Sequence, residues 1–169
     1  MKKILIPCLL LVAVFFQHDL MAQKAKYQSI FIYNFTKYVK WPNESNNTFI
    51  IGVLGNSDVY ASLVEMSEKK KEASGGQLKV VKFNSLADIG DCHILFVPER
   101  ESSKLAEINA KTSGKNILVI TEKSGLAEKG SVINFIEEEG KLKFELNQAQ
   151  AEIRGLKVSG SLISLAKLV

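Results

Sequence analysis

The sequence predicts an α/β fold, with one three-layer domain, a mostly parallel sheet, helices on both faces and an antiparallel C-terminal hairpin. Three observations lead to this prediction. Apolar strands alternate with helical segments over residues 48–121, the pattern of a parallel sheet covered on both faces. Cys92–Val97 and Asn116–Thr121 are predominantly apolar, as buried strands are. Val132–Ile136 and Leu142–Leu146 alternate apolar and polar residues around a short turn, which indicates a hairpin.

Residues 1–22 have the features of a signal peptide. Lys2 and Lys3 supply positive charge, and Ile4–Phe16 is an uncharged apolar run. This run is shorter than the roughly 20 residues that cross a bilayer core, so we expect a cleaved export signal and a single exported domain over 23–169. Removing the signal leaves one cysteine and one histidine, which excludes an internal disulfide and a four-ligand zinc site.

The predicted elements continue in order from a long amphipathic helix over Lys24–Trp41, whose apolar residues recur every three or four positions and which Pro42 ends. The apolar stripe of this helix is Tyr27, Ile30, Phe31, Phe35 and Tyr38. The later elements are a strand (Thr48–Leu54), a helix (Asp58–Lys70), a strand (Leu78–Phe83), a helix (Ser103–Thr112), a helix capped by Asn147, a strand (Leu156–Val158) and a closing helix (Ser161–Leu168).

The charge of the chain does not indicate a nucleic-acid partner. Lys and Arg number 22 against 18 acidic residues, a formal net charge of +4. Only Arg100 and Arg154 are arginines, and the lysines are spread among acidic residues rather than gathered around aromatic ones. Nucleic-acid-binding domains usually concentrate their basic residues on one face.

No residue set indicates catalysis, a metal or a cofactor. Cys92 and His93 are neighbours on a predicted strand, where successive side chains point to opposite faces, so they cannot act as nucleophile and base. We therefore expect Cys92 to be a buried structural thiol. The pairs Ser67–Lys70 and Ser164–Lys167 match one motif of penicillin-recognising enzymes, but the companion motifs are absent.

The turn Gly55–Asn56–Ser57 is the candidate site for a small ligand. It follows a predicted parallel strand and precedes a helix, the position at which α/β proteins bind ligands. The spacing of Gly52 and Gly55 does not match a dinucleotide fingerprint. A tight turn is the alternative reason for these glycines.

The first helix is the candidate surface for a protein partner, because aromatic residues concentrate there. Tyr33 and Trp41 lie off the apolar stripe, so we expect them to be exposed and, with Tyr38, to contact a partner. The alternative is that these side chains close the core. We also expect the hairpin to form an open sheet edge, with Leu126 at the apolar tip of the loop that enters it.

Several segments resemble the YfiR family, which is defined by the DUF4154 domain. The first is Tyr33–Pro42, which reads Tyr-Asn-Phe-x-Lys-Tyr-Val-x-Trp-Pro. The others are Ile51–Gly55, Cys92–Phe96, Ile117–Thr121, Gly140–Asn147, and Gly155–Ser159 followed by Leu162. Together they cover nearly all of the predicted mature chain in order.

The resemblance implies a small periplasmic α/β protein that regulates without catalysing. Its best-known relative binds and represses the periplasmic region of an inner-membrane diguanylate cyclase, which influences cyclic di-GMP and biofilm formation. An outer-membrane-associated protein relieves that repression, and other members serve different membrane sensors. Two other functions remain open: a periplasmic small-ligand-binding protein and an envelope enzyme with an unrecognised site. A homodimer also remains open as a partner arrangement. The studied member has two disulfides, which this chain cannot form, so redox control through a disulfide is not expected.

Overall fold

A computed structural model describes residues 5–42, 48–69 and 76–169, and the side chains from Met21 onward within them. The helices are α1 (Leu5–Tyr38), α2 (Asp58–Lys69), the 3-10 helix η1 (Glu99–Lys104), α3 (Leu105–Lys111), α4 (Gln148–Ile153) and α5 (Gly160–Ile163). The strands are β1 (Val39–Lys40), β2 (Thr48–Leu54), β3 (Gln77–Phe83), β4 (Ile94–Val97), β5 (Leu118–Thr121), β6 (Ile133–Glu138), β7 (Lys141–Leu146), β8 (Lys157–Val158) and β9 (Lys167–Leu168). The predicted loop over 43–47 and the predicted helix residue Lys70 lie outside these residues.

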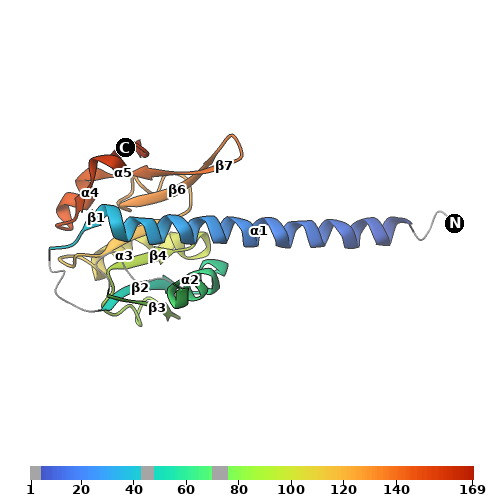
Figure 1. The fold of residues 1–169 in the computed structure, drawn as a ribbon, viewed down its shortest axis with the longest axis horizontal. Coiled ribbons are helices and arrows are strands. Elements are labelled where there is room, and N and C mark those ends of the chain that lie inside the picture. The colour runs from blue at the N-terminus through green and yellow to red at the C-terminus, as the bar shows by residue number, and fades with distance from the viewer. Residues whose placement is uncertain (1–4, 43–47, 70–75) are drawn as a thin grey trace.

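The predicted α/β architecture is confirmed. The main sheet has the strand order β3-β2-β4-β5-β6-β7-β9, and all its pairs are parallel except the β6–β7 hairpin. A separate two-stranded ribbon joins β1 to β8. The long helix α1 crosses the domain and extends beyond it toward the N-terminus (Figure 1).

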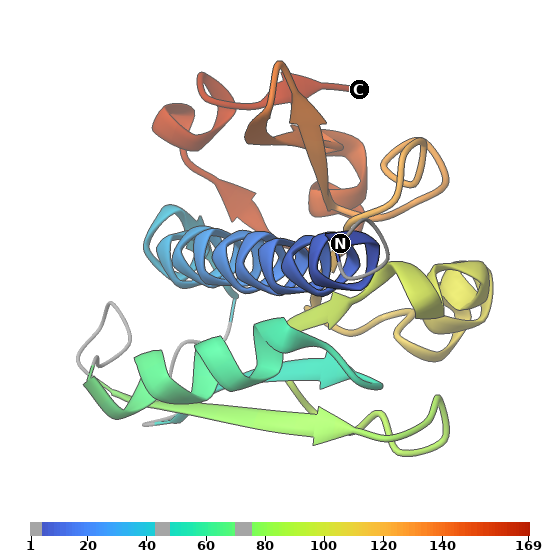
Figure 2. The same cartoon turned by 90° about the vertical axis from the view of Figure 1, so that its right-hand side faces the viewer.

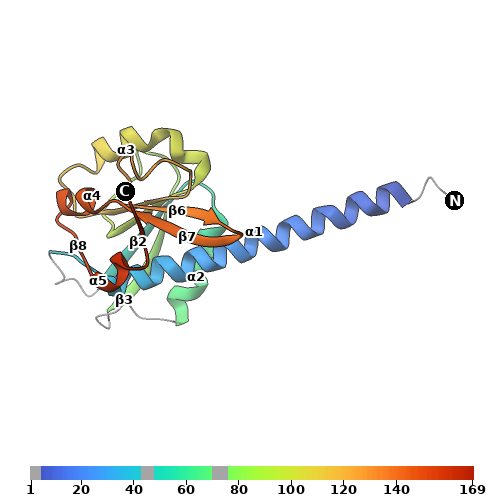
Figure 3. The same ribbon diagram turned by 90° about the horizontal axis from the view of Figure 1, so that it is seen from above.

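The sheet separates two apolar cores, as helices on both faces require. Alternate residues of β4 point to opposite cores, with Ile94 and Phe96 on one side and Leu95 and Val97 on the other. The first core also takes in residues of α1 and α2, and the second takes in residues of α3. Viewed along α1, this helix lies between α2 and the C-terminal elements (Figure 2), and the view from above places α3 across the sheet from α2 and α5 (Figure 3).

The hairpin turn has the geometry that its sequence favours. Glu139 and Gly140 both have positive φ, 53° and 69°, between the paired residues Glu138 and Lys141. Two central residues with positive φ match the right-handed twist of the flanking strands in a two-residue hairpin. The predicted Asn147 cap is also confirmed, because its side chain accepts a hydrogen bond from the backbone N–H of Gln150 at 3.0 Å.

The first helix differs from its prediction at both ends, and it begins at Leu5 rather than Lys24. It ends at Tyr38 rather than Trp41, because Val39 and Lys40 leave the helix and pair with β8. The backbone N–H of Ser159 donates to the carbonyl of Tyr38 at 2.8 Å and continues this pairing. A contact distant in sequence therefore ends α1 before Pro42 does.

The buried stripe of α1 is displaced around the helix from the predicted one. Its members within the described side chains are Ala25, Gln28, Ser29, Ile32, Phe35 and Thr36. Two polar members are satisfied locally, since Ser29 donates to the Ala25 carbonyl at 2.8 Å and Thr36 to the Tyr33 carbonyl at 2.7 Å. The displacement leaves Tyr27, Ile30 and Tyr38 exposed at 50%, 39% and 40%.

The predicted closing helix over Ser161–Leu168 is present only in its first part and is followed by a strand. The helix α5 stops at Ile163, and Lys167–Leu168 form β9 beside Glu145–Leu146 of β7. Lys167 also reaches Glu138, with its Nζ 3.0 Å from Oε1. The hairpin is consequently covered at one end of its outer edge, and only the part of β7 from Lys141 to Phe144 lacks a strand partner there among the described residues.

Arg154 links the C-terminal part of the chain to α3 through hydrogen bonds. Its side chain is 7% exposed and donates to Asn109 Oδ1 at 2.8 Å and to Thr112 Oγ1 at 3.1 Å. Longer hydrogen bonds reach the carbonyls of Thr112 and Ile117 at 3.4 Å. Burial lowers the pKa of this guanidinium. Its polar partners within the described residues are side-chain oxygens, the carbonyl at the C-terminal end of α3 and the Ile117 carbonyl, rather than a carboxylate.

We expect Arg154→Ala to lower the free energy of unfolding by about 2–4 kcal/mol, because several buried acceptors lose their donor. The matched control is Arg100→Ala, which removes the other arginine from an exposed position and should change stability by less than about 0.5 kcal/mol. Urea unfolding of both variants measures this. Equal effects of the two substitutions would contradict the assigned role of Arg154.

Candidate functional site

Cys92 and His93 point into different cores and do not form a reactive pair. Cys92 belongs to the core on the α3 side. The His93 ring stacks on Phe49 at 4.4 Å, and Phe49 belongs to the core on the α1 side. His93 Nδ1 accepts a hydrogen bond from the backbone N–H of Ile50 at 3.0 Å. These two side chains therefore pack separately, although both precede β4, which begins at Ile94 rather than at the predicted Cys92, so their separation does not come from alternation along a strand.

The Cys92 thiol lies in an apolar environment. Its Sγ would be 3.4 Å from a Cβ placed on Gly52, and the Phe83 ring occupies the space that such a Cβ would need. Burial raises the pKa of this thiol to about 12. A thiol with so high a pKa is a poor nucleophile at neutral pH. In the part of the chain with described side chains, no three His, Cys, Asp or Glu residues are placed to hold a metal ion.

The predicted ligand turn lines a cleft of about 540 Å³ at the carboxyl ends of the parallel strands. Asn56 and Ser57 follow β2, Arg100 follows β4 and Lys123 follows β5. Gly55 does not line it but makes the turn possible, with a φ of +69° and its N–H donating to the Phe83 carbonyl at 2.7 Å. The structure thus brings the predicted turn together with charged side chains that the sequence reading did not select.

Glu122 joins α1 to the floor of this cleft. Its Oε2 accepts a hydrogen bond from Gln28 Nε2 at 2.8 Å and lies 3.2 Å from Lys24 Nζ. Its Oε1 accepts from the backbone N–H of Glu99 at 3.1 Å. One carboxylate therefore links α1, the end of β5 and the start of η1, so α1 forms one wall of the cleft.

Two of the predicted partner-binding residues are buried. Trp41 is 7% exposed, packs edge-on against Phe49 at 4.9 Å and donates from Nε1 to the His93 carbonyl at 3.2 Å. Leu126 is 6% exposed and belongs to the core on the α3 side. The expectations that Trp41 is exposed and that Leu126 forms an apolar loop tip are wrong, because each side chain packs into a core formed by residues distant in sequence.

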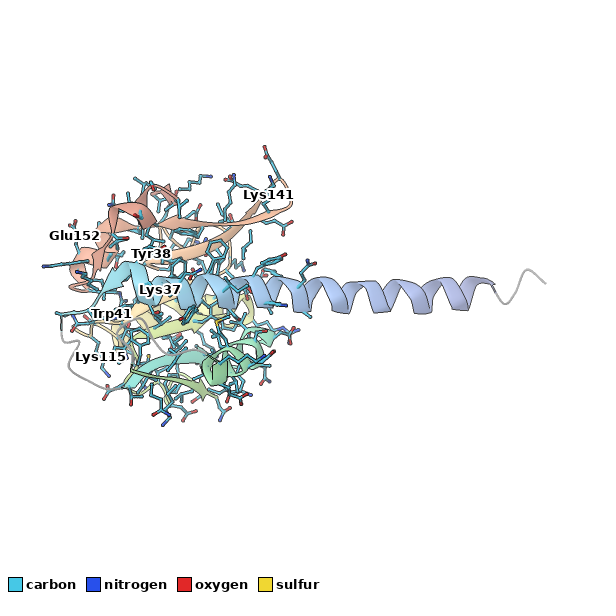
Figure 4. The ribbon with its side chains drawn as sticks, viewed as in Figure 1. Lys37, Tyr38, Trp41, Lys115, Lys141 and Glu152 are labelled. Atoms are coloured by element: carbon cyan, nitrogen blue, oxygen red, sulfur yellow. The ribbon has the colours of Figure 1, made fainter. Side chains whose placement is uncertain are left out.

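The other predicted aromatic residues lie nearer the surface. Tyr38 is exposed at the end of α1, where Figure 4 labels it beside Lys37. Tyr33 is half-buried, and Lys37 Nζ lies 4.6 Å from the centre of its ring. A cation above an aromatic face holds both groups at the surface. Tyr38 is thus the more exposed of the two tyrosines, and the binding role of both stays a prediction.

A groove between α1 and the hairpin is the exposed apolar feature that the sequence reading missed. Its volume is about 650 Å³. It is lined by Met21, Gln23, Lys24, Tyr27, Phe31, Glu137, Gly140, Lys141 and Leu142. The unpaired part of the β7 edge begins at Lys141, which Figure 4 places at the tip of the hairpin. The sequence shows that aromatic residues are concentrated in α1. It does not show which of them are exposed, because that depends on how the helix is rotated against the sheet.

Comparisons with known proteins identify the family and the general fold. The family model described as YfiR/HmsC-like, DUF4154, matches residues 25–167. A comparison with curated proteins found no match.

Two solved structures have a similar fold at low sequence identity. One is the ABC domain from Streptococcus pneumonia in complex with L-Trp, at 14% identity and a TM-score of 0.56, covering 81% of this chain and 58% of that one. The other is a conserved domain protein from Vibrio cholerae O1 biovar El Tor, at 14% identity and a TM-score of 0.52, covering 85% and 59%. The chain therefore spans less than two thirds of the length of either.

The helices within the described residues were also compared with the requirements of a membrane span. None of them combines the length and the apolar character needed to cross a bilayer.

Burial should keep the Cys92 thiol protonated and slow to react in the folded protein. We expect a bulky thiol reagent at pH 8 to label native protein much more slowly than protein in denaturant. The raised pKa also determines how this thiol changes the free energy of unfolding with pH, because the unfolded thiol loses its proton near pH 9 and the folded one only near pH 12. The stability that this thiol contributes is complete below pH 9 and is lost as the pH rises toward 12.

The free energy of unfolding is measured as a function of pH for the parent protein and for Cys92→Ala. The difference between the two profiles gives the contribution of the thiol, because the lysines titrate in both proteins. The variant should lose less stability than the parent above pH 9. Rapid labelling of the native thiol, or identical pH profiles, would contradict the buried assignment.

Proposed function

Because the chain belongs to the YfiR/HmsC-like family, we propose that it is an exported regulator that binds and represses an inner-membrane signalling protein. The target would be of the diguanylate cyclase or sensor kinase type, and the consequence would be lower cyclic di-GMP and less biofilm. An outer-membrane-associated protein would relieve the repression. The family match over residues 25–167 is the observation that carries this proposal.

The N-terminal sequence supports a periplasmic location for this regulator. We propose that residues 1–22 are a cleaved signal peptide and that the domain over 23–169 acts in the periplasm, because a basic start and a short apolar run precede it. A regulator in that compartment can reach the periplasmic part of a membrane protein directly.

The groove between α1 and the hairpin supports a protein-binding role. Tyr27 is half exposed within it, beside the partly exposed edge of β7. Exposed aromatic side chains often contribute much of the energy at protein interfaces, and an open strand edge offers backbone groups to a partner. We propose Tyr27 as the central contact, with Tyr38 further along the same exposed side of α1.

The proposed repression can be measured in the host cell. We expect deletion of the chain to raise cyclic di-GMP and expression of the parent chain to restore it. Tyr27→Ala should fail to restore it while melting at nearly the parent temperature, because truncating a central aromatic contact typically costs about 2 kcal/mol or more of binding.

The control for this experiment is Leu165→Ala, which truncates a 70% exposed apolar side chain outside the groove and should restore repression fully. No change in cyclic di-GMP on deletion would contradict the repressor role. Full activity of Tyr27→Ala would show that the partner contacts a different part of the surface.

Small-ligand binding in the cleft at Gly55–Ser57 is the second candidate function. Cations and carboxylates both line this cleft, including Arg100, Lys123 and Asp58, which suits a small zwitterion. One structural neighbour is described as a complex with L-Trp. A thermal-shift screen with free amino acids tests this candidate, since a bound ligand raises the melting temperature. Ligand-dependent stabilisation that Arg100→Ala abolishes would support it, and no shift at millimolar concentrations would contradict it.

A further inference from the structure

The β1–β8 ribbon places two lysines directly opposite each other on the protein surface. Lys40 pairs with Lys157, and the preceding pair is Val39 with Val158. Paired residues of an antiparallel ladder point to the same side, and side chains alternate along each strand. Val39 is buried, so both lysines point outward, and both are exposed. We call Lys37, Lys40 and Lys157 the lysine ribbon.

The pairing of Lys40 with Lys157 adds no favourable charge contact to the fold among the described side chains. Like charges directly opposite in a ladder destabilise it. No carboxylate among the described side chains lies within ion-pair distance of Lys37, Lys40 or Lys157. The hairpin differs in this respect, because Lys143 and Lys167 both lie 3.0 Å from oxygens of Glu138. An external anion would therefore relieve a repulsion that no described carboxylate compensates.

The side chains near the lysine ribbon include residue types that are common at a membrane–water interface. Tyr38 lies between Lys37 and Lys40 in the sequence and is 40% exposed. The helix α4 packs beside β8 and carries Ile153, which is 74% exposed, next to Glu152. Figure 4 shows Tyr38, Lys37 and Glu152 at the end of the domain that lies opposite the hairpin tip. Basic side chains with a tyrosine and an exposed apolar residue are typical of surfaces that lie on a bilayer.

We propose that the lysine ribbon docks this chain onto an anionic phospholipid surface. A lipid surface fits better than an acidic protein segment, because lysine is depleted at protein interfaces, whereas flexible lysines follow a fluid array of phosphates. Each lysine near an anionic leaflet contributes enough to change binding about fivefold. Such docking would hold a periplasmic regulator near membrane proteins, but it does not depend on the identity or existence of a protein partner.

Vesicle sedimentation tests the proposal with the protein purified after export, without any partner. The probes are vesicles of phosphatidylcholine alone and vesicles with phosphatidylglycerol added at about one third of the lipid. We expect binding only to the anionic vesicles, and a loss of binding in high salt as charge is screened. Lys40→Gln and Lys157→Gln should each lower the partition coefficient about fivefold.

Lys141→Gln is the matched control, since it removes the same charge from the exposed hairpin tip at the other end of the domain. It should leave vesicle binding unchanged. The melting temperatures of Lys40→Gln and Lys157→Gln should not fall, because each substitution removes a repulsion, so lost binding cannot be attributed to unfolding.

Three results would overturn the proposal. These are equal binding to both kinds of vesicle, an equal loss of binding in Lys141→Gln, and binding to an acidic peptide such as polyglutamate with none to anionic vesicles. Because no partner protein is present, these results leave the proposed repression to be judged separately by the cyclic di-GMP measurements.

Discussion

The packing of α1 across the sheet is the contact on which the rest of the structure depends. Ile32 and Phe35 are fully buried, and the Phe35 ring lies 5.3 Å from Phe144 and 6.1 Å from Phe135 in the hairpin. The same helix packs against α2, which covers the parallel strands. One helix therefore joins the parallel half of the sheet to its antiparallel half, and burial of large aromatic rings is the main stabilising contribution at that junction.

The orientation of α1 also decides which surfaces remain for binding. Because the buried stripe passes through Gln28 and Ser29, the opposite side presents Tyr27 and Ile30. The hydrogen bond from Gln28 to Glu122 supports this rotation, which the burial of Ile32 and Phe35 mainly determines. The α1 wall of the cleft, the groove and the exposure of Tyr38 are thus consequences of one rotation about the helix axis.

Local patterns in the sequence predicted much of the fold but little of the site. The strands, the hairpin and the Asn147 cap were predictable, because periodicity and turn residues lie within each segment. The rotation of α1 was not predictable from the apolar pattern, because the buried stripe includes the polar residues Ser29 and Thr36. These two side chains can be buried since each donates a hydrogen bond to a carbonyl of its own helix. Trp41 and Leu126 are buried by contacts distant in sequence, and β9 forms only because β7 offers it a partner. The Gly55–Ser57 turn was placed correctly, since the end of a parallel strand is a local signal.

Site-specific photo-cross-linking in the native host is the most direct test of the claim that the exposed side of α1 contacts a membrane signalling protein. A photoreactive residue at Tyr27 should form an adduct that mass spectrometry identifies as an inner-membrane protein with a cyclase or kinase domain. The same residue at Leu165, which is exposed outside the groove, should form no such adduct. An adduct of that kind from Leu165 and none from Tyr27 would contradict the account.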